Sequence, residues 1–282
     1  MLSNTVLKQS ANEAKRQYEA FKALLAHRSG AHKAYGDLNS VTEPEWKKLL
    51  FVALSLIVLS FLFFDTMAGH WQPLLPEWLY SIFRTISRFG KSDYTLIPSG
   101  LLVIVIAFLP PGATRYAVRS ILYRFQMLGL FIFVAIAGSG LLNNLIKVMF
   151  GRARPKFFGE LGPYFFDPPG INHGYQSFPS GHSATAGAMA IIMVLLFPKQ
   201  KRLWLFLAGM IAFSRIMVGA HYPSDTVAGF AFGAGVTWLF AKWCVHRRLL
   251  FRVQDGLIRL PTNSGLSLTS VYKALHLFRR TA

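Results

Sequence analysis

The residues of this 282-residue chain that could do chemistry lie in three short segments of its second half. A phosphate group carries about two negative charges and several strong acceptor oxygens, so its site needs fixed cations and converging N–H donors. The residue types in these segments therefore predict a site that binds phosphate and transfers it through a histidine. The candidates are Lys147 and Arg154, then Ser180, Gly181 and His182, then Arg215, His221 and Asp225.

The first segment supplies two predicted phosphate ligands, Lys147 and Arg154. An arginine can bind phosphate oxygens as a bidentate fork, and a lysine binds them as a point charge. Pro155 disfavours helix at Arg154, so we expect Lys147 to end an apolar helix and Arg154 to fold back from the loop that follows. Taken alone, either residue could equally be a surface cation whose stem is buried in the membrane interface.

The second segment predicts the start of a helix that faces an anion. Ser180 is a suitable N-cap, and Gly181 lets the backbone approach a ligand closely. The N–H groups at a helix N-terminus point toward a bound anion, and His182 in the first turn could protonate the departing oxygen. A Ser-Gly pair alone would also fit an ordinary capped helix.

The third segment predicts the nucleophile. His221 and Asp225 are four residues apart, so the carboxylate could fix the tautomer of the imidazole and raise its basicity. Such a histidine can attack phosphorus, and water activated by His182 can then hydrolyse the phosphohistidine. Arg215 would bind the same phosphoryl oxygens. The alternative is a His–Asp pair that only adds stability.

We expect neither a metal nor a cofactor at this site. Lys and Arg side chains can supply the positive charge that a phosphate needs. The sequence also lacks the CxxC and HExxH patterns that are typical of metal sites. The predicted reaction is therefore independent of metal ions.

The elements that carry these residues are predicted to be membrane helices. Hydrophobic residues make up 53% of the chain and charged residues 15%, and a span needs about 20 mostly apolar residues. The chain is predicted to be an all-α integral membrane protein with six transmembrane helices. Residues 77–89 mix aromatic and charged residues and predict an interfacial helix. The predicted spans lie near 47–68, 93–110, 122–147, 182–197, 203–219 and 225–244.

The distribution of Lys and Arg orients these helices. Most of the 30 basic residues lie in segments that six crossings place on the cytoplasmic side. Both termini are then cytoplasmic, and the three candidate segments share the outer face, where they form an outer-face active site. This bias accounts for the net charge of +18 without a nucleic-acid partner. The predicted domains are a cytoplasmic amphipathic extension over 1–46, a membrane domain over 47–245 and a basic cytoplasmic tail over 246–282.

The three segments resemble the pattern of the type 2 phosphatidic acid phosphatase superfamily, which is Lys-x6-Arg-Pro, Pro-Ser-Gly-His and Ser-Arg-x5-His-x3-Asp. The resemblance implies a metal-independent phosphatase with His221 as nucleophile, Asp225 orienting it and His182 as acid. It also implies an outward-facing site in a bacterial inner membrane. Soluble bacterial acid phosphatases and vanadium haloperoxidases share these residues, but their chains lack a membrane-spanning pattern of this kind. The further fixed positions that the sequence matches are Pro155, Pro179 and Ser214.

The predicted substrate is a phospholipid or isoprenoid phosphate. The candidates are undecaprenyl pyrophosphate, phosphatidylglycerol phosphate, phosphatidic acid and the phosphates of lipid A. The loop over 151–179 is expected to select among them, because it adds two cations that suit a second phosphate and aromatic residues that could contact acyl chains. Anchoring at the membrane interface is the common role of such aromatic residues. The candidate substrate-selecting residues are Arg152, Lys156, Phe157, Phe158 and Tyr164.

Two other functions fit the same residues. A lipid-to-lipid phosphotransferase would pass the phosphoryl group to a lipid hydroxyl instead of water. A non-catalytic lipid-binding or transport protein is a second alternative, although binding alone would need only the cations and not His182, His221 and Asp225. No obligate protein partner is evident from the sequence.

Overall fold

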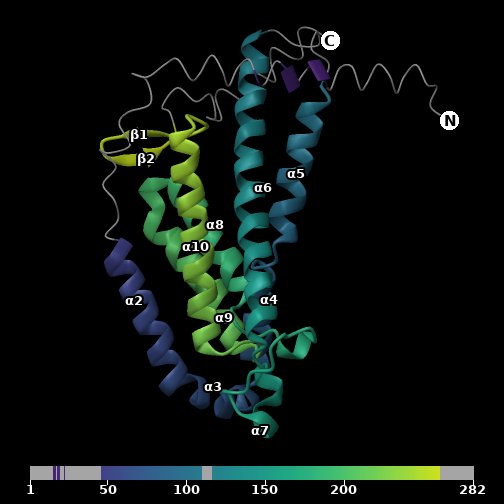
Figure 1. Cartoon of the computed structure of the whole chain (residues 1–282), viewed down its shortest axis with the longest axis vertical. Helices are drawn as coiled ribbons and strands as arrows, with labels where there is room; N and C mark the ends of the chain where they lie inside the picture. The colour runs from purple at the N-terminus through teal and green to yellow at the C-terminus, as the bar shows by residue number, and fades with distance from the viewer. Residues whose placement is uncertain (1–14, 17, 20–21, 23–45, 110–115, 261–282) are drawn as a thin grey trace, which may run out of the picture. The chain divides into compact units, whose positions relative to one another are not determined.

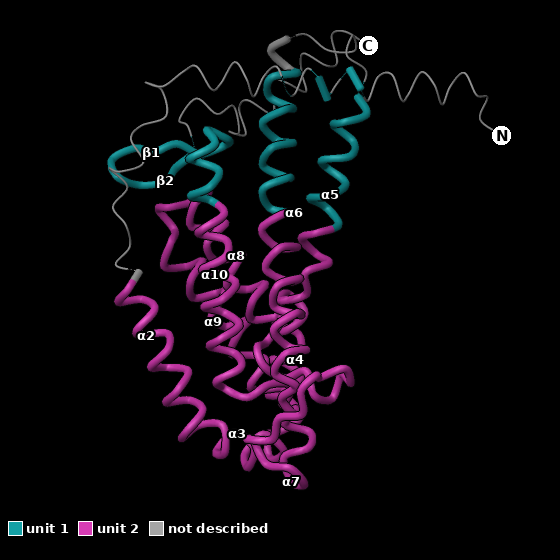
Figure 2. The backbone as a smooth tube through the Cα atoms, in the orientation of Figure 1, with its two compact units in different colours: residues 1–42, 97–133, 241–282 teal, residues 43–96, 134–240 magenta. Residues whose placement is uncertain are grey.

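The computed structural model describes residues 15–16, 18–19, 22, 46–109 and 116–260, which fold mainly into helices (Figure 1). The predicted extension over 1–46 and the part of the predicted tail after residue 260 lie almost wholly outside the described residues. The chain divides into two compact units, which Figure 2 distinguishes by colour.

One unit comprises residues 43–96 and 134–240 and carries all of the predicted site residues. Its first apolar stretch is a helix interrupted by a π-helical turn. Its elements are α2 (Trp46–Leu59), η3 (Ser60–Phe64), α3 (Asp65–Trp71), η4 (Gln72–Leu74), α4 (Glu77–Arg88), the end of α6 (Tyr116–Phe150), η5 (Pro155–Phe157), α7 (Phe158–Leu161), η6 (His173–Tyr175), α8 (Gly181–Leu196), η7 (Pro198–Gln200), α9 (Lys201–Met217) and most of α10 (Pro223–His246).

Glycines let the backbones of α8 and α10 pack directly against each other. A Cβ atom on Gly229 would clash with the carbonyl oxygen of Ser180, and one on Gly233 would clash with that of Ala184. Small residues permit such close helix contacts in membrane proteins. The contact also places the start of α8 beside α10, where the Ser180 amide donates to the carbonyl of Asp225 at 2.9 Å.

The other unit contains most of α5 (Asp93–Ala107), the first part of α6, the end of α10 and a β-hairpin. Strand β1 (Arg252–Gln254) pairs antiparallel with β2 (Leu257–Arg259). Asp255 and Gly256 form the two-residue turn at φ values of 53° and 70°. The all-α prediction missed this hairpin, although an Asp-Gly pair is a strong hairpin signal.

Each of the six predicted spans coincides with a helix. Within the described ranges, four helical stretches are long and apolar enough to cross a membrane, and they fit a membrane protein: Lys47–Leu74, Glu77–Ala107, Arg119–Phe150 and Pro223–His246. The helix α8 is apolar but has 16 residues, and α9 has 17, which is short for a span of about 20 residues. The six crossings and the interfacial position of α4 therefore stay predictions.

Candidate active site

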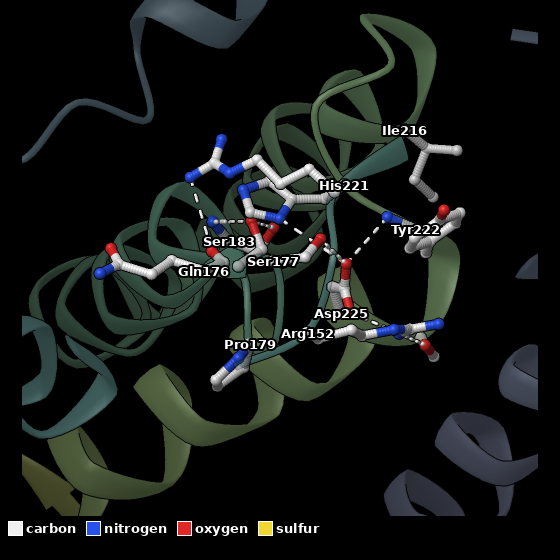
Figure 3. A network of polar contacts seen from close by, with 12 residues as sticks. Arg152, Gln176, Ser177, Pro179, Ser183, Ile216, His221, Tyr222 and Asp225 are labelled. Carbon is white, nitrogen blue, oxygen red and sulfur yellow. Dashed lines mark hydrogen bonds and ion pairs between the residues drawn. The ribbon is translucent and has the colours of Figure 1, made fainter. Parts of the chain in front are cut away.

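The three predicted segments come together at the ends of helices within one unit. Figure 3 shows His221 and Asp225 beside Arg152, Ser177 and Tyr222. His221 lies in the turn between α9 and α10, and the Ser-Gly-His segment begins α8. Lys147 lies in the last turn of α6 and Arg154 in the loop that follows, as the sequence predicted.

His221 is a buried histidine, with 2% of its surface exposed. Gly219, at a φ of 64°, turns the chain after α9, and the His221 amide donates to the Arg215 carbonyl at 3.3 Å. Nδ1 lies 3.7 Å from Oδ2 of Asp225, which is too long for a hydrogen bond but short enough for attraction. Burial lowers the pKa of His221 to about 4, although Asp225 opposes the shift. The imidazole is therefore neutral at pH 7, as a nucleophile must be.

Asp225 has a carboxylate that is held from several sides. Oδ1 accepts from Nη1 of Arg152 at 2.5 Å. Oδ2 accepts from Oγ of Ser177 at 2.6 Å and from the amide of Tyr222 at 3.0 Å, and it faces His221. These bonds fix the position of the acceptor that the imidazole meets, which is how a carboxylate can orient a histidine.

Arg152 is fully buried, so it adds no charge for a second substrate phosphate, contrary to the prediction. Nη1 donates to Oγ of Ser224 at 2.7 Å as well as to Asp225. Nη2 donates to Oδ2 of Asp65 and to the carbonyl of Pro163, each at 2.7 Å. The guanidinium thus lies between two carboxylates and has its charge compensated locally.

Asp65 is a charged residue of the site that the sequence did not predict. It is fully buried and belongs to α3, in the first apolar stretch of the chain. Its carboxylate accepts from the amide of Ser224 at 2.9 Å and from Oγ of the same residue at 2.5 Å, besides Arg152. The available signal was an ionisable residue inside a predicted membrane span, which is costly and usually functional.

Three cations gather near the histidines, and none of them forms an ion pair with a carboxylate of the described residues. Lys147 has 8% of its surface exposed, and a Cβ atom on Gly181 would lie 3.5 Å from Nζ. Lys147 lies within electrostatic reach of both Arg154 and Arg215. Such a cluster repels itself, so an anion is the natural ligand between its members.

The guanidiniums of Arg154 and Arg215 are incompletely bonded. Nη2 of Arg154 reaches the carbonyl of Gln176 only at 3.5 Å, and Nη1 of Arg215 donates to Oγ of Ser87. Among the residues that the structure describes, neither Nε has a hydrogen-bond partner. Burial lowers the pKa of Arg154. Both side chains keep donors available for phosphate oxygens.

The start of α8 has the predicted capping geometry. Ser180 is the N-cap, and its Oγ accepts from the amide of Ser183 at 3.4 Å. His182 lies in the first turn, where Gly90 packs against it: a Cβ atom on Gly90 would be 3.2 Å from the imidazole Cδ2. His182 is also within electrostatic reach of Arg215 and His221. The structure therefore brings the predicted acid and the predicted nucleophile to one site.

The predicted substrate-selecting aromatic residues hold their own loop in place. Phe157 stacks on Tyr175 with ring centroids 5.7 Å apart, and Nζ of Lys156 lies 4.6 Å from the Phe157 centroid. Phe158 packs on Gly69, where a Cβ atom would clash with its ring. These contacts give the two rings a packing role within the protein, and their predicted contact with acyl chains or with the membrane interface stays a prediction.

Tyr164 ties the same loop to the π-helical turn η3. Its hydroxyl lies 3.1 Å from the carbonyl of Phe61, and the two rings are 4.9 Å apart. A π-turn disrupts the regular helical hydrogen bonds, and the Tyr164 hydroxyl supplies a donor there. Tyr164 keeps 46% of its surface exposed, so it can still meet lipid.

Known proteins share sequence similarity with this chain. Residues 128–249 match the model of the PAP2 superfamily. The chain is 36% identical over 217 residues to lipid A 1-phosphatase of Rhizobium johnstonii, covering 75% of this chain and 86% of that protein. It is 29% identical over 167 residues to phosphatidylglycerophosphatase B of Bacillus subtilis, covering 55% of this chain and 70% of that protein.

One solved structure is also similar, a transmembrane PAP2-type phosphatidylglycerolphosphate phosphatase from Bacillus subtilis. It has a TM-score of 0.49 and 23% identity, and the match covers 70% of this chain and 94% of that one. The identity and coverage of the lipid A 1-phosphatase relative, with the family match across the three segments, confirm the resemblance. The chain therefore belongs to the PAP2 superfamily and is a phosphoric monoester hydrolase.

Proposed function

We propose that this protein hydrolyses the phosphate of a membrane lipid, with the 1-phosphate of lipid A as the preferred substrate. The observation that carries the reaction class is the cluster of Lys147, Arg154 and Arg215 beside a buried His221–Asp225 pair. The lipid A preference rests on relatives: lipid A 1-phosphatases of Rhizobium johnstonii and Rhizobium etli are 36% and 35% identical.

The first proposed step forms a phosphohistidine. Because Nδ1 of His221 faces Asp225, the free Nε2 attacks phosphorus, and the bond from phosphorus to the lipid oxygen breaks. His182 gives its proton to that oxygen. The three cations and the amides at the start of α8 stabilise the charge on the other phosphoryl oxygens.

The second step releases phosphate. His182, now neutral, takes a proton from water, and the water oxygen attacks phosphorus as the bond to Nε2 breaks. This restores His221 and His182 to their starting states. The charge needed at phosphorus comes from Lys and Arg, so we expect activity to persist in a chelator. Activity that is lost in chelator and restored by Mg²⁺ would contradict a metal-independent reaction.

We also propose that the enzyme lies in a bacterial inner membrane with the site facing the periplasm and both termini in the cytoplasm. The Lys and Arg distribution supports this orientation. The test uses Ile171→Cys, since Ile171 is 80% exposed in the loop after α6, whereas the natural Cys244 is buried. A membrane-impermeant thiol reagent should label it from the periplasmic side. Labelling only from the cytoplasmic side would reverse the orientation.

The decisive assay measures phosphate release by purified protein in nanodiscs. It compares lipid A with undecaprenyl pyrophosphate, phosphatidylglycerol phosphate and phosphatidic acid. We expect lipid A to give the highest kcat/KM, and His221→Ala to fall to background while lipid binding survives.

Undecaprenyl pyrophosphate is the second candidate, because undecaprenyl-diphosphatase BcrC of Bacillus subtilis is 30% identical. Unchanged hydrolysis by His221→Ala would refute the mechanism, and radiolabel appearing on a second lipid would indicate a phosphotransferase.

A further inference from the structure

The first apolar stretch of the chain contributes a buried acid to the site, and the three signature segments do not account for it. Asp65 is fully buried and pairs with Arg152, whose other guanidinium nitrogen pairs with Asp225. The ion pairs measure 2.7 Å and 2.5 Å. Burying charge is costly unless every charge is paired and hydrogen-bonded, so this row of three charges needs a reason to exist.

The row is closely bonded at both ends. Asp65 accepts from the amide and the hydroxyl of Ser224. Arg152 is also held by the Pro163 carbonyl, at 3.1 Å from Nε and 2.7 Å from Nη2. This leaves the guanidinium one position, and that position fixes where Oδ1 of Asp225 lies. Oδ2 of Asp225 then faces the imidazole of His221.

Charge balance gives Asp65 a second effect. Asp65, Arg152 and Asp225 together carry one excess negative charge. A phosphohistidine with a protonated Nδ1 carries positive charge on the imidazole, which an excess negative charge stabilises. Without Asp65 the row would be neutral, because Arg152 would compensate Asp225 completely. Because Asp65 shares the charge of Arg152, Asp225 is only partly neutralised and can stabilise a positive charge on His221.

We propose that Asp65 is a positioning residue for the phosphatase reaction, acting through Arg152 on Asp225 and hence on His221. It touches neither substrate nor the reacting atoms. The first apolar stretch, which lies outside the matched residues 128–249, is therefore part of the working enzyme. This inference rests on the proposed roles of His221 and Asp225.

The test replaces Asp65 by its uncharged isostere. We expect Asp65→Asn to lower kcat about 10- to 100-fold, the usual cost of losing a partner that orients a site residue. KM, and inhibition by inorganic phosphate, should stay within about threefold, because Lys147, Arg154 and Arg215 are unchanged. Asp93→Asn is the matched control, an exposed acid in the first turn of α5, and should keep wild-type kcat.

A second variant separates charge balance from mere support of the fold. Arg152→Gln leaves Asp65 and Asp225 without their shared cation, and two close carboxylates resist being ionised together. The double variant Asp65→Asn/Arg152→Gln restores the single excess negative charge. We expect its kcat to be at least about tenfold above that of Arg152→Gln, a non-additive result. The ratio of these two kcat values also tests the role of Asp65 if Asp65→Asn alone fails to fold.

Two outcomes would overturn the proposal. One is an Asp65→Asn enzyme with kcat within twofold of the control. The other is a double variant no more active than Arg152→Gln, which would reduce Asp65 to a link between helices. Neither outcome would contradict the proposed function, because that function is tested separately by the loss of phosphate release in His221→Ala. If that variant stays active, the function fails first and the role of Asp65 falls with it.

Discussion

Arg152 and Arg154 are two residues apart and have opposite surroundings. Arg152 is fully buried and donates to Asp65, Asp225 and Ser224. Burial opposes its charge, yet the two carboxylates raise the pKa of Arg152 above its usual value. Arg154 is half-buried, reaches one carbonyl at 3.5 Å, and has a pKa lowered by burial.

The difference indicates how a phosphate site separates its cations. A buried arginine with carboxylate partners is satisfied and orients its neighbours, because moving it would leave charges unpaired. A partly buried arginine without such partners has donors left for an anion. Arg215 resembles Arg154 in this respect, since its Nε lacks a partner within the described part of the chain. The pairing of an arginine, more than its presence in a motif, therefore predicts whether it binds phosphate.

The largest expected effect comes from removing the paired arginine. Arg152→Ala leaves Asp65 and Asp225 buried without a cation, and breaking a buried pair in this way costs about 3–5 kcal/mol. We expect the variant to lose that much unfolding free energy in detergent, measured by denaturant titration. Arg154→Ala is the control and should stay within about 1 kcal/mol of wild type. Equal losses in the two variants would remove the distinction between them.

The unpaired arginine should affect the reaction instead of the fold. Arg154→Ala removes a donor to the developing charge at phosphorus, and a loss of this kind lowers the rate about 10²- to 10³-fold. We expect kcat/KM for phosphate release to fall by that factor while the thermal midpoint is kept. A drop below about threefold would mean that Arg154 does not bind the phosphoryl group.

The sequence predicted the helices and the helix ends near the candidate site well, for local reasons. The Ser-Gly pair predicted an N-cap, and Ser180 is one. Pro155 predicted a break before Arg154, and the chain leaves α6 at Phe150. Spacing and capping preferences act over a few residues, so a sequence displays them directly. Helix ends then bring distant motifs to one site.

The pairing of Arg152 could not be predicted in the same way. Its partners Asp65 and Asp225 are 87 and 73 residues away, and no local pattern encodes which acid meets which cation. By spacing alone Arg152 looked like an additional phosphate ligand beside Arg154. Only burial and hydrogen-bond geometry distinguish the two residues, and these depend on the packing of α3 and α10 around the loop.

The pH dependence of stability tests the surroundings of His221. Its pKa is lowered to about 4 in the folded protein, first by burial and then by Lys147 and Arg154 against the opposing Asp225, whereas an unfolded histidine titrates near 6.5. Between these values the unfolded chain binds more protons, so the contribution of His221 is lost as the pH falls from about 6.5 to about 4. We expect the thermal midpoint of wild type to fall more over this window than that of His221→Asn.

Arg154 should also affect the pH window over which His221 loses its contribution to stability. Because Arg154 contributes to the low pKa of His221, Arg154→Ala should raise that pKa toward its unfolded value. The pH window over which stability is lost should then be narrower, and the loss smaller. Identical profiles for wild type and His221→Asn would show instead that other groups control acid stability. The measurement is a series of thermal unfolding curves at pH 7, 6, 5 and 4 in one detergent.

The smallest effect concerns the side-chain hydrogen bond between Arg215 and helix α4. Its Nη1 donates to Oγ of Ser87, a buried residue of α4. Ser87→Ala removes that acceptor but leaves the guanidinium, so the loss should be that of a single hydrogen bond, about 0.5–1.5 kcal/mol. We expect kcat/KM to fall about fivefold, while Ser81→Ala, at an exposed position of the same helix, stays unchanged. If the two variants behave alike, α9 alone orients Arg215, and α4 has no part in holding the phosphate-binding cations.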